Sequence, residues 1–165
     1  MTTPTLVPVE THVPVAAWGV LVERGVLSSV GLGSCVAVML HDGVARVGAL
    51  AHVLLPHESL SRDRSRPAKF GSTAVPFLLN EMRRHGSRAQ PVARIVGGAS
   101  MFGALLSSGV NMGERNVDAV KQRLAASGIP LIGEDVGGDY GRSVYFDVAT
   151  GEVRVVSMRH GRRIL

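Results

Sequence analysis

The chain of 165 residues is 45% hydrophobic and 19% charged, and its formal net charge at pH 7 is +5. This composition suits one compact domain with an apolar core and excludes wholesale disorder, because the chain can bury enough apolar surface to offset its conformational entropy. The single cysteine, Cys35, excludes an intramolecular disulfide framework and favours a reducing compartment, so we expect a cytoplasmic protein.

Short apolar runs between glycines predict a chain rich in strands. The first strands are expected at residues 26–30 and 36–40, followed by a turn at 41–43. Residues 44–55 are almost continuously apolar, which predicts a strand covered on both faces. Further strands are expected at residues 94–96, 131–132, 143–146 and 152–157, the last two joined by a hairpin loop at 147–151.

Two helices are predicted by apolar residues at helical spacing. The first begins near Ser72 or Thr73, either of which can cap it, takes Pro76 into its opening turn and ends by Gly86. The second covers residues 114–127, and its apolar stripe consists of Val117, Val120 and Leu124.

A third helix is expected near residues 101–108. Strands outnumber helices and do not alternate with them regularly, so the sequence predicts an α+β fold. We expect a single domain over residues 1–165, in which residues 1–20 and the basic tail at 158–165 are peripheral. No segment has the length of a membrane span, and the N-terminus lacks the basic start of a signal peptide.

The lone cysteine occupies a position suited to a nucleophile. Cys35 follows the glycine-rich residues 31–34 and directly precedes a predicted strand. A glycine-rich approach leaves backbone N–H groups open, so the amides near Gly33 and Ser34 are candidates for binding the oxyanion that forms when a thiolate attacks a carbonyl. The alternative is that Cys35 is a small, buried hydrophobic residue.

A cysteine nucleophile needs a base, and His52 is the best placed of the 6 histidines. It lies within the apolar run 49–55, where a titratable ring is unfavourable without a partner. Two neighbouring strands would bring it beside Cys35 and give a thiol–imidazole pair. The alternative is a core histidine whose ring is bonded to a backbone carbonyl.

Other classes of site lack support in the sequence. One cysteine with scattered histidines gives no zinc-ligand spacing, so we expect no metal. Gly31 and Gly33 lack the third glycine of the dinucleotide fingerprint, and a strand follows them instead of a helix. The arginines carry no interleaved aromatic residues, so nucleic-acid binding rests on net charge alone, and the arginine-rich stretch 57–69 is interpreted as a solvated loop.

Taken together, several motifs resemble those of the chemoreceptor glutamine deamidase CheD family. The resemblance spans about residues 31–155, and the order and joint presence of the motifs make it specific. The matching blocks are residues 31–35 (GLGSC), 51–56 (AHVLLP), 73–76 (TAVP), 97–102 (GGASMF), 113–117 (GERNV), 134–138 (EDVGG) and 141–142 (GR).

The resemblance implies a fold and a set of site residues. The family fold is similar to that of deamidating toxins, with mixed sheets in a sandwich-like core and about three helices on the outside. The family's cysteine nucleophile and histidine base fall on Cys35 and His52. Its threonine lies six residues before the cysteine, where this chain has Ser29, which keeps the hydroxyl but loses the methyl group that fixes the rotamer. No cofactor is implied.

The resemblance also implies an activity, which is hydrolysis of glutamine carboxamides on the cytoplasmic helices of bacterial chemoreceptors to give glutamate and ammonia. Some relatives bind the phosphatase CheC, and some act as receptor methylesterases. We expect a monomeric enzyme that binds no nucleic acid and does not insert into membranes. Two alternatives remain open, a non-catalytic adaptor that binds receptor or CheC, and a basic nucleic-acid-binding domain.

Overall fold

The computed structural model describes residues 7–102 and 109–165. They contain ten strands, which are β1 (Glu10–His12), β2 (Trp18–Val22), β3 (Val26–Leu32), β4 (Val36–Asp42), β5 (Val47–Val53), β6 (Val92–Gly97), β7 (Leu131–Val136), β8 (Arg142–Asp147), β9 (Val153–Ser157) and β10 (Gly161–Ile164). The helices in the same residues are α1 (Gly71–Arg84), α2 (Met112–Ala126) and two short 3-10 helices, η1 (Glu58–Leu60) and η2 (Pro67–Lys69).

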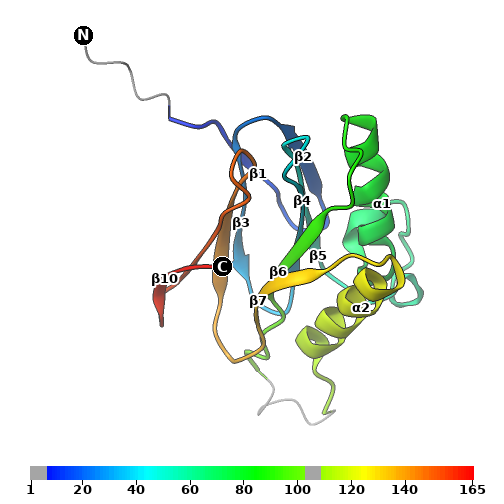
Figure 1. Ribbon diagram of the computed structural model, residues 1–165. Helices are drawn as coiled ribbons and strands as arrows, with labels where there is room; N and C mark the ends of the chain where they lie inside the picture. Colours follow the sequence, from blue (N-terminus) through cyan, green and yellow to red (C-terminus); the bar gives the residue numbers. More distant parts are fainter. Residues whose placement is uncertain (1–6, 103–108) are drawn as a thin grey trace.

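The strands form two sheets of five strands each. Sheet A has the order β1-β3-β8-β9-β10, and sheet B has the order β2-β5-β4-β6-β7. Both sheets are mixed, because β1 pairs parallel to β3 and β6 pairs parallel to β7, whereas the other neighbours are antiparallel. The two helices cover the face of sheet B that points away from sheet A (Figure 1). This arrangement confirms the predicted α+β fold with a sandwich-like core of mixed sheets.

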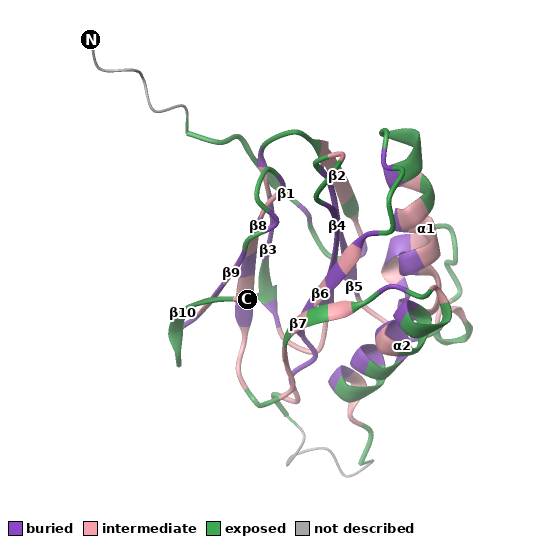
Figure 2. Ribbon diagram, viewed as in Figure 1, coloured by how far each residue is buried: buried purple, intermediate pink, exposed green. Residues whose placement is uncertain are grey.

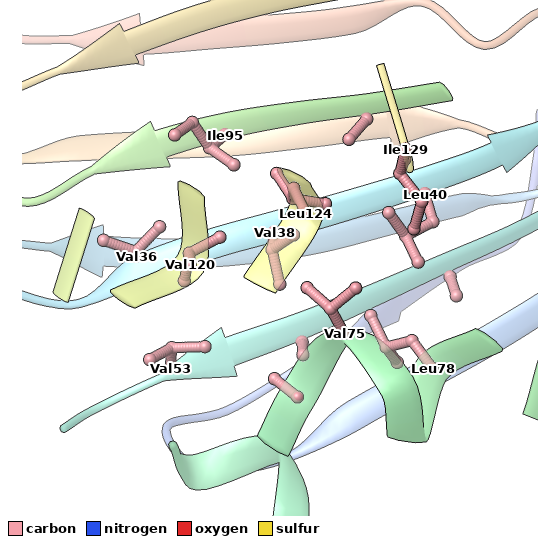
Figure 3. Close-up of a cluster of buried hydrophobic side chains, with 14 of the residues drawn as sticks. Val36, Val38, Leu40, Val53, Val75, Leu78, Ile95, Val120, Leu124 and Ile129 are labelled. Atoms are coloured by element: carbon pink, nitrogen blue, oxygen red, sulfur yellow. The ribbon is translucent and has the colours of Figure 1, made fainter. Parts of the chain in front are cut away.

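Sheet B is buried on both faces, and alternate residues of its strands enter two different cores. Val36, Val38 and Leu40 of β4 pack toward the helices, in the core shown in Figure 3. Ala37 and Met39 of the same strand pack toward sheet A. All residues of β4 and β5 are buried, as the purple ribbons of Figure 2 show at the centre of the molecule. The nearly continuous apolar run in the sequence reflects this double burial.

The predicted strands are confirmed, but the turn after β4 is displaced. β4 continues through Asp42, and the turn covers residues 43–46 instead of 41–43, so β5 begins at Val47 instead of residue 44. The Asp42 carboxylate accepts hydrogen bonds from the N–H groups of Val44 and Ala45 and thereby holds this turn. β5 ends at Val53 because the next two N–H groups bond to the Lys69 carbonyl.

Both predicted helices are present, but the N-cap expected for the first one was wrong. Phe70 is the N-cap residue of α1, and Thr73 lies inside the first turn with its hydroxyl bonded to the Pro67 carbonyl. α2 begins two residues earlier than expected, because the Asn111 side chain caps it by accepting from the Glu114 N–H.

The described residues contain two α-helices instead of about three. The third was expected at 101–108, of which residues 103–108 lie outside the described residues, and Met101 and Phe102 form a turn. Neither of the two helices described in residues 7–102 and 109–165 has the length and apolar character needed to cross a lipid bilayer.

Pro76 lies in the second turn of α1, beyond the opening turn where it was expected. A proline there lacks the N–H that would bond to the carbonyl four residues earlier, which is that of Ser72. The Arg123 side chain of α2 donates to this carbonyl instead, with an N–O distance of 2.8 Å. The lost intrahelical bond is thus replaced by one that joins the two helices.

Both ends of the chain form strands that belong to the two sheets, although residues 1–20 and 158–165 were expected to be peripheral. β1, which includes His12, pairs with β3, and β2 forms one edge of sheet B, although the first strand was expected only at residues 26–30. In the basic tail, β10 pairs with β9 and forms the exposed edge of sheet A (Figure 2). Two tail arginines form ion pairs, Arg159 with Asp139 and Arg163 with Asp135.

Asp42 provides the first testable prediction, which concerns stability. The buried carboxylate accepts from five donors, which are the N–H groups of Val44, Ala45, Arg88 and Ala89 and the hydroxyl of Ser87. Burial alone would raise the pKa of Asp42, but these bonds outweigh it and hold the pKa below 3.8. Asp42→Asn places an N–H₂ group against donors and is expected to lower the free energy of unfolding by about 2 kcal/mol.

The sign of the pH dependence follows from the lowered pKa. The contribution of Asp42 is fully present above the pKa of the unfolded chain, about 3.9, and is lost as the pH falls through the lower folded value. Urea unfolding of wild type and Asp42→Asn at neutral and acidic pH measures this, with Asp118→Asn, at an exposed carboxylate of α2, as the control. If acid lowers the free energy of unfolding of wild type by no more than that of Asp42→Asn, the Asp42 carboxylate does not have a lowered pKa in the folded protein.

Candidate active site

The structure places Cys35 and His52 on the same face of sheet B. Cys35 directly precedes β4, and His52 lies near the end of β5 opposite Ala37. Cys35 is two residues before Ala37, so it is the diagonal neighbour of His52, at a separation that side chains can bridge. Both residues face sheet A, where Cys35 packs against the inter-sheet core. The predicted approach of these two strands is therefore present.

Sheet A supplies the group that orients the His52 ring. Ser29 of β3 is fully buried, and its Oγ lies 3.3 Å from His52 Nδ1 and 2.6 Å from the carbonyl oxygen of Val13. A carbonyl can only accept, so the single hydroxyl proton of Ser29 is donated to Val13. Ser29 Oγ must then accept from the Nδ1–H of His52, which leaves Nε2 unprotonated in the neutral ring. Nε2 is buried and has no partner among the described residues.

Backbone bonds on both sides of His52 fix the position of its strand. The His52 N–H donates to the Ala17 carbonyl at 3.0 Å, and the His52 carbonyl accepts from the Ala16 N–H at 2.9 Å. Val13, whose carbonyl lies 3.5 Å from His52 Nδ1, belongs to the same N-terminal segment. Residues 13–17 therefore hold both the backbone and the ring of His52.

The electrostatics of the site favour a neutral resting pair. Burial is the main cause that raises the pKa of the Cys35 thiol above 9.0, and the Cys35 N–H opposes it by lowering this pKa. Burial is likewise the main cause that lowers the pKa of His52 below 6.5, against a raising effect from the Val13 carbonyl. At neutral pH the thiol therefore keeps its proton and the imidazole is ready to accept one.

The loop that carries Cys35 is held by its carbonyl groups. The Gly33 carbonyl accepts from the Ala99 N–H and the Cys35 carbonyl from the Gly98 N–H, both at 2.8 Å. These bonds require Gly97, which has φ +118°, and a Cβ at this position would lie 2.2 Å from the Cys35 oxygen. The N–H groups of Gly33 and Ser34 have no acceptor within the described part of the chain, whereas the Cys35 N–H acts on its own sulfur. The first two are thus open to a substrate oxygen.

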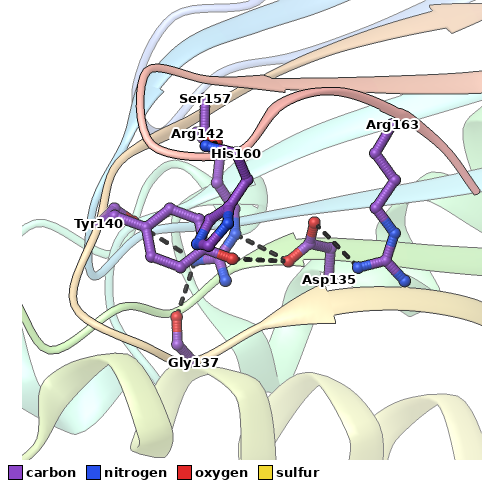
Figure 4. A network of polar contacts seen from close by, with 7 residues as sticks. All are labelled: Asp135, Gly137, Tyr140, Arg142, Ser157, His160 and Arg163. Atoms are coloured by element: carbon purple, nitrogen blue, oxygen red, sulfur yellow. Dashed lines mark hydrogen bonds and ion pairs between the residues drawn. The ribbon is translucent and has the colours of Figure 1, made fainter.

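An arginine network supports the residues beside this loop (Figure 4). Arg142, 3% exposed, donates to the Asp135 carboxylate at 2.9 Å and to the Gly137 carbonyl at 2.7 Å, and its guanidinium lies 4.0 Å from the centre of the Tyr140 ring. Arg142 pairs with Leu32, the last residue of β3. The network therefore fixes the residues next to the strand end from which the Cys35 loop begins.

An open cavity of about 600 Å³ lies next to the same loop. Gly31 contributes to one side of it, and Tyr140, Val156 and Met158 contribute to the others. Met101 also lines the cavity, and its sulfur lies close to Gly33. Neither Cys35 nor His52 lines the cavity, so it lies beside the candidate catalytic groups and does not contain them.

Comparison with models of protein families identifies the family of this chain. Residues 54–157 match the model of the family described as CheD, chemotactic sensory transduction. The chain belongs to the CheD family. The match covers the arginine network and both helices, whereas Cys35 and His52 precede it.

Curated CheD proteins extend the similarity over nearly the whole chain. The chemoreceptor glutamine deamidase CheD of Thermotoga maritima is 42% identical over 151 residues, which cover 91% of this chain and 93% of that protein. A probable chemoreceptor glutamine deamidase CheD of Moorella thermoacetica is 44% identical over 90% of each chain. The corresponding protein of Thermococcus kodakarensis is 37% identical over 94% of this chain and 97% of its own. Alignments of this coverage necessarily include residues 29–52.

Two groups near the candidate site were missed by reasoning from the sequence. The contact of the Val13 carbonyl with Ser29 and His52 could not be predicted from the sequence, because every residue type has a backbone carbonyl. Asn116 of α2 donates to the Ser34 carbonyl at 2.9 Å, although 82 residues separate the two in the chain. Asn116 does lie within the 113–117 block that resembles the CheD family, but the pattern alone did not indicate what it touches.

Proposed function

We propose that this protein is a protein-glutamine deamidase of chemoreceptors, with Cys35 as nucleophile and His52 as base. The observation that carries the proposal is the buried imidazole of His52, which lies on the same sheet face as Cys35 and has Nδ1 3.3 Å from Ser29 Oγ and Nε2 without a partner among the described residues. Membership of the CheD family and the name of the Thermotoga maritima relative supply the substrate class. The receptor's cytoplasmic helices would then be the substrate and the cytoplasm the site of action.

The first half of the reaction forms a covalent intermediate. His52 Nε2 takes the proton of the Cys35 thiol while the sulfur attacks the δ-carbon of a substrate glutamine. The former carbonyl oxygen becomes an oxyanion, and the N–H groups of Gly33, Ser34 and Cys35 are candidates to bind it. When the tetrahedral intermediate collapses, the C–N bond breaks and protonated His52 gives its proton to the departing ammonia, which leaves a thioester.

The second half returns the enzyme to its starting state. Neutral His52 removes a proton from water, and the resulting hydroxide attacks the thioester carbon. Collapse of this intermediate breaks the C–S bond, and the proton on His52 returns to the Cys35 sulfur. One glutamine and one water are consumed, and one glutamate and one ammonia are produced.

The decisive experiment incubates the protein with cytoplasmic fragments of chemoreceptors and maps the products by mass spectrometry. We expect the mass gain of an amide-to-acid conversion at particular glutamines, together with release of ammonia. Retention of receptor binding without any conversion would instead support the adaptor alternative. Salt-sensitive binding to oligonucleotides with no conversion would support the nucleic-acid alternative.

Ser29 offers a prediction about the orienting group. Ser29→Ala removes the acceptor for His52 Nδ1–H, and we expect the rate of deamidation to fall about tenfold, equivalent to one lost hydrogen bond. Ser29→Thr keeps the hydroxyl and is expected to remain active. Steady-state ammonia release measures the effect.

The neighbouring Ser28→Ala is the matched control for Ser29→Ala. Ser28 is equally buried, but its hydroxyl donates to Glu10 and makes no contact with the site. Equal rates for Ser29→Ala and Ser28→Ala would show that the Ser29 hydroxyl does not orient the base.

A further inference from the structure

Asn116 joins the two segments that carry the candidate nucleophile and base. It is 0% exposed on α2, and its Nδ2 donates to the Ser34 carbonyl at 2.9 Å and to the Leu54 carbonyl at 3.1 Å. Two carbonyl acceptors can bond only to the N–H₂ end of an amide, so the orientation of this side chain is determined. Ser34 directly precedes Cys35, and Leu54 follows His52 by two residues.

The bond to Ser34 has a consequence for the next N–H group. The peptide unit between Ser34 and Cys35 is planar and trans, so its C=O and N–H point in opposite directions. Because the carbonyl points toward Asn116, the Cys35 N–H points away from α2. Burial is the larger influence on the pKa of the Cys35 thiol and raises it, but this N–H lowers it, as expected for a donor directed toward the sulfur.

We propose that Asn116 is a positioning residue that holds the Ser34–Cys35 peptide so that the Cys35 N–H faces the reacting sulfur and the oxyanion. This inference rests on the role proposed for Cys35. The bond to Leu54 fixes the segment that follows His52 relative to the same peptide. Loss of the Asn116 amide would therefore release the nucleophile loop while the chemical groups of Cys35 and His52 remain.

Two further observations separate Asn116 from an ordinary core residue. Its Oδ1 is buried without a partner among the described residues, although buried polar atoms are normally bonded. α2 also approaches the 98–99 segment so closely that a Cβ on Gly113 would lie 2.4 Å from the Ala99 carbonyl oxygen. The close contact at Gly113 thus brings the Asn116 side chain deep into the protein. Both N–H donors of its amide are bonded to carbonyls of the segments that carry Cys35 and His52.

The test compares wild type with Asn116→Ala, using receptor fragments as substrate. Removing an oxyanion donor lowers kcat by about 10²- to 10³-fold, so misplacing one is expected to lower kcat by at least about tenfold with little change in KM. A second readout is the rate of Cys35 alkylation by iodoacetamide as a function of pH. With the N–H released from the sulfur, the pKa of the thiol rises and the profile shifts to higher pH.

The matched control is Leu124→Ala, which truncates a buried residue of the same helix that does not touch the site. It is expected to lower the thermal midpoint without changing kcat per folded molecule or the alkylation profile. If Asn116→Ala behaves like Leu124→Ala in both readouts, Asn116 serves only the fold and the inference is overturned.

A second variant, Asn116→Ser, keeps a small polar group that is too short to reach both carbonyls, and it should show the same losses. Failure of both variants to fold would also assign Asn116 to the fold and overturn the inference. The alkylation profile separates this inference from the proposed function. If wild type converts no glutamine, the deamidase proposal fails, yet a shifted profile in Asn116→Ala would still establish that Asn116 positions the Cys35 peptide.

Discussion

Replacing Cys35 with alanine is expected to abolish deamidation of chemoreceptor fragments, with a fall in rate of more than about 10⁴-fold. The reason is that a carboxamide is a poor electrophile, and the proposed route divides its hydrolysis into two easier steps that both require the sulfur. The thiol is the only one in the chain, so no other residue can take over the covalent step. Ammonia release and the mass of the receptor peptides measure the loss.

The fold should survive this change, which makes the result easy to interpret. Cys35 is only half-buried and lies at the edge of the inter-sheet core, so its truncation is expected to leave the far-UV circular dichroism unchanged. Cys35→Ser preserves the size of the side chain but offers a much less acidic nucleophile, and it should be similarly inactive. Conversion of the same glutamines by wild type and Cys35→Ala would refute cysteine catalysis.

His52→Ala is expected to have the second largest effect, which is visible even without substrate. In wild type, neutral His52 can accept the thiol proton as the sulfur attacks the reagent, so alkylation should be faster near pH 7 than ionisation of the thiol alone allows. This assistance should be lost as the pH drops through the pKa of His52, which burial holds below 6.5. Without the imidazole, only the fraction of the thiol that has already ionised can react, and burial keeps this fraction small near pH 7 because it raises the pKa of Cys35 above 9.0. The alkylation rate of the variant should then keep rising about tenfold per pH unit across the neutral range, and near pH 7 it should be at least about tenfold slower than wild type.

His41→Gln is the matched control for this experiment. His41 is also a buried histidine of sheet B, but its Nε2 lies 2.9 Å from the Val148 carbonyl, away from Cys35. Its replacement should leave the alkylation profile as it is in wild type. If His52→Ala reproduces the wild-type profile, the thiol and the imidazole do not form a functional pair.

The parts of the site that lie within local patterns were predictable from the sequence. The apolar residues around His52 indicated a strand buried on both faces, and a titratable ring in such a strand needs a polar partner. The glycine-rich approach to Cys35 likewise indicated an exposed backbone before a strand. The predicted proximity of the two residues followed from the pairing of successive strands, which is the commonest connection.

The remaining features depend on contacts that no local pattern records. The α1 cap was assigned to Ser72 or Thr73 by residue type, but the helix begins at Gly71 because the Leu55 and Pro56 carbonyls accept from the first N–H groups. β1 was not predicted, because a strand of three residues carries too little periodicity to detect. The Val13 carbonyl acts through its backbone, so its side chain gives no indication of its role.

The contact between Ser29 and His52 also has a mechanical consequence. The imidazole is carried by sheet B, whereas the group that sets its tautomer is carried by sheet A. A slip of one sheet over the other by a single residue, about 3.3 Å, would separate the two atoms. The orientation of the His52 ring therefore depends on the alignment of the two halves of the sandwich. A first shear between them should lower the proposed deamidation rate about as much as Ser29→Ala does, before either sheet loses its own hydrogen bonds.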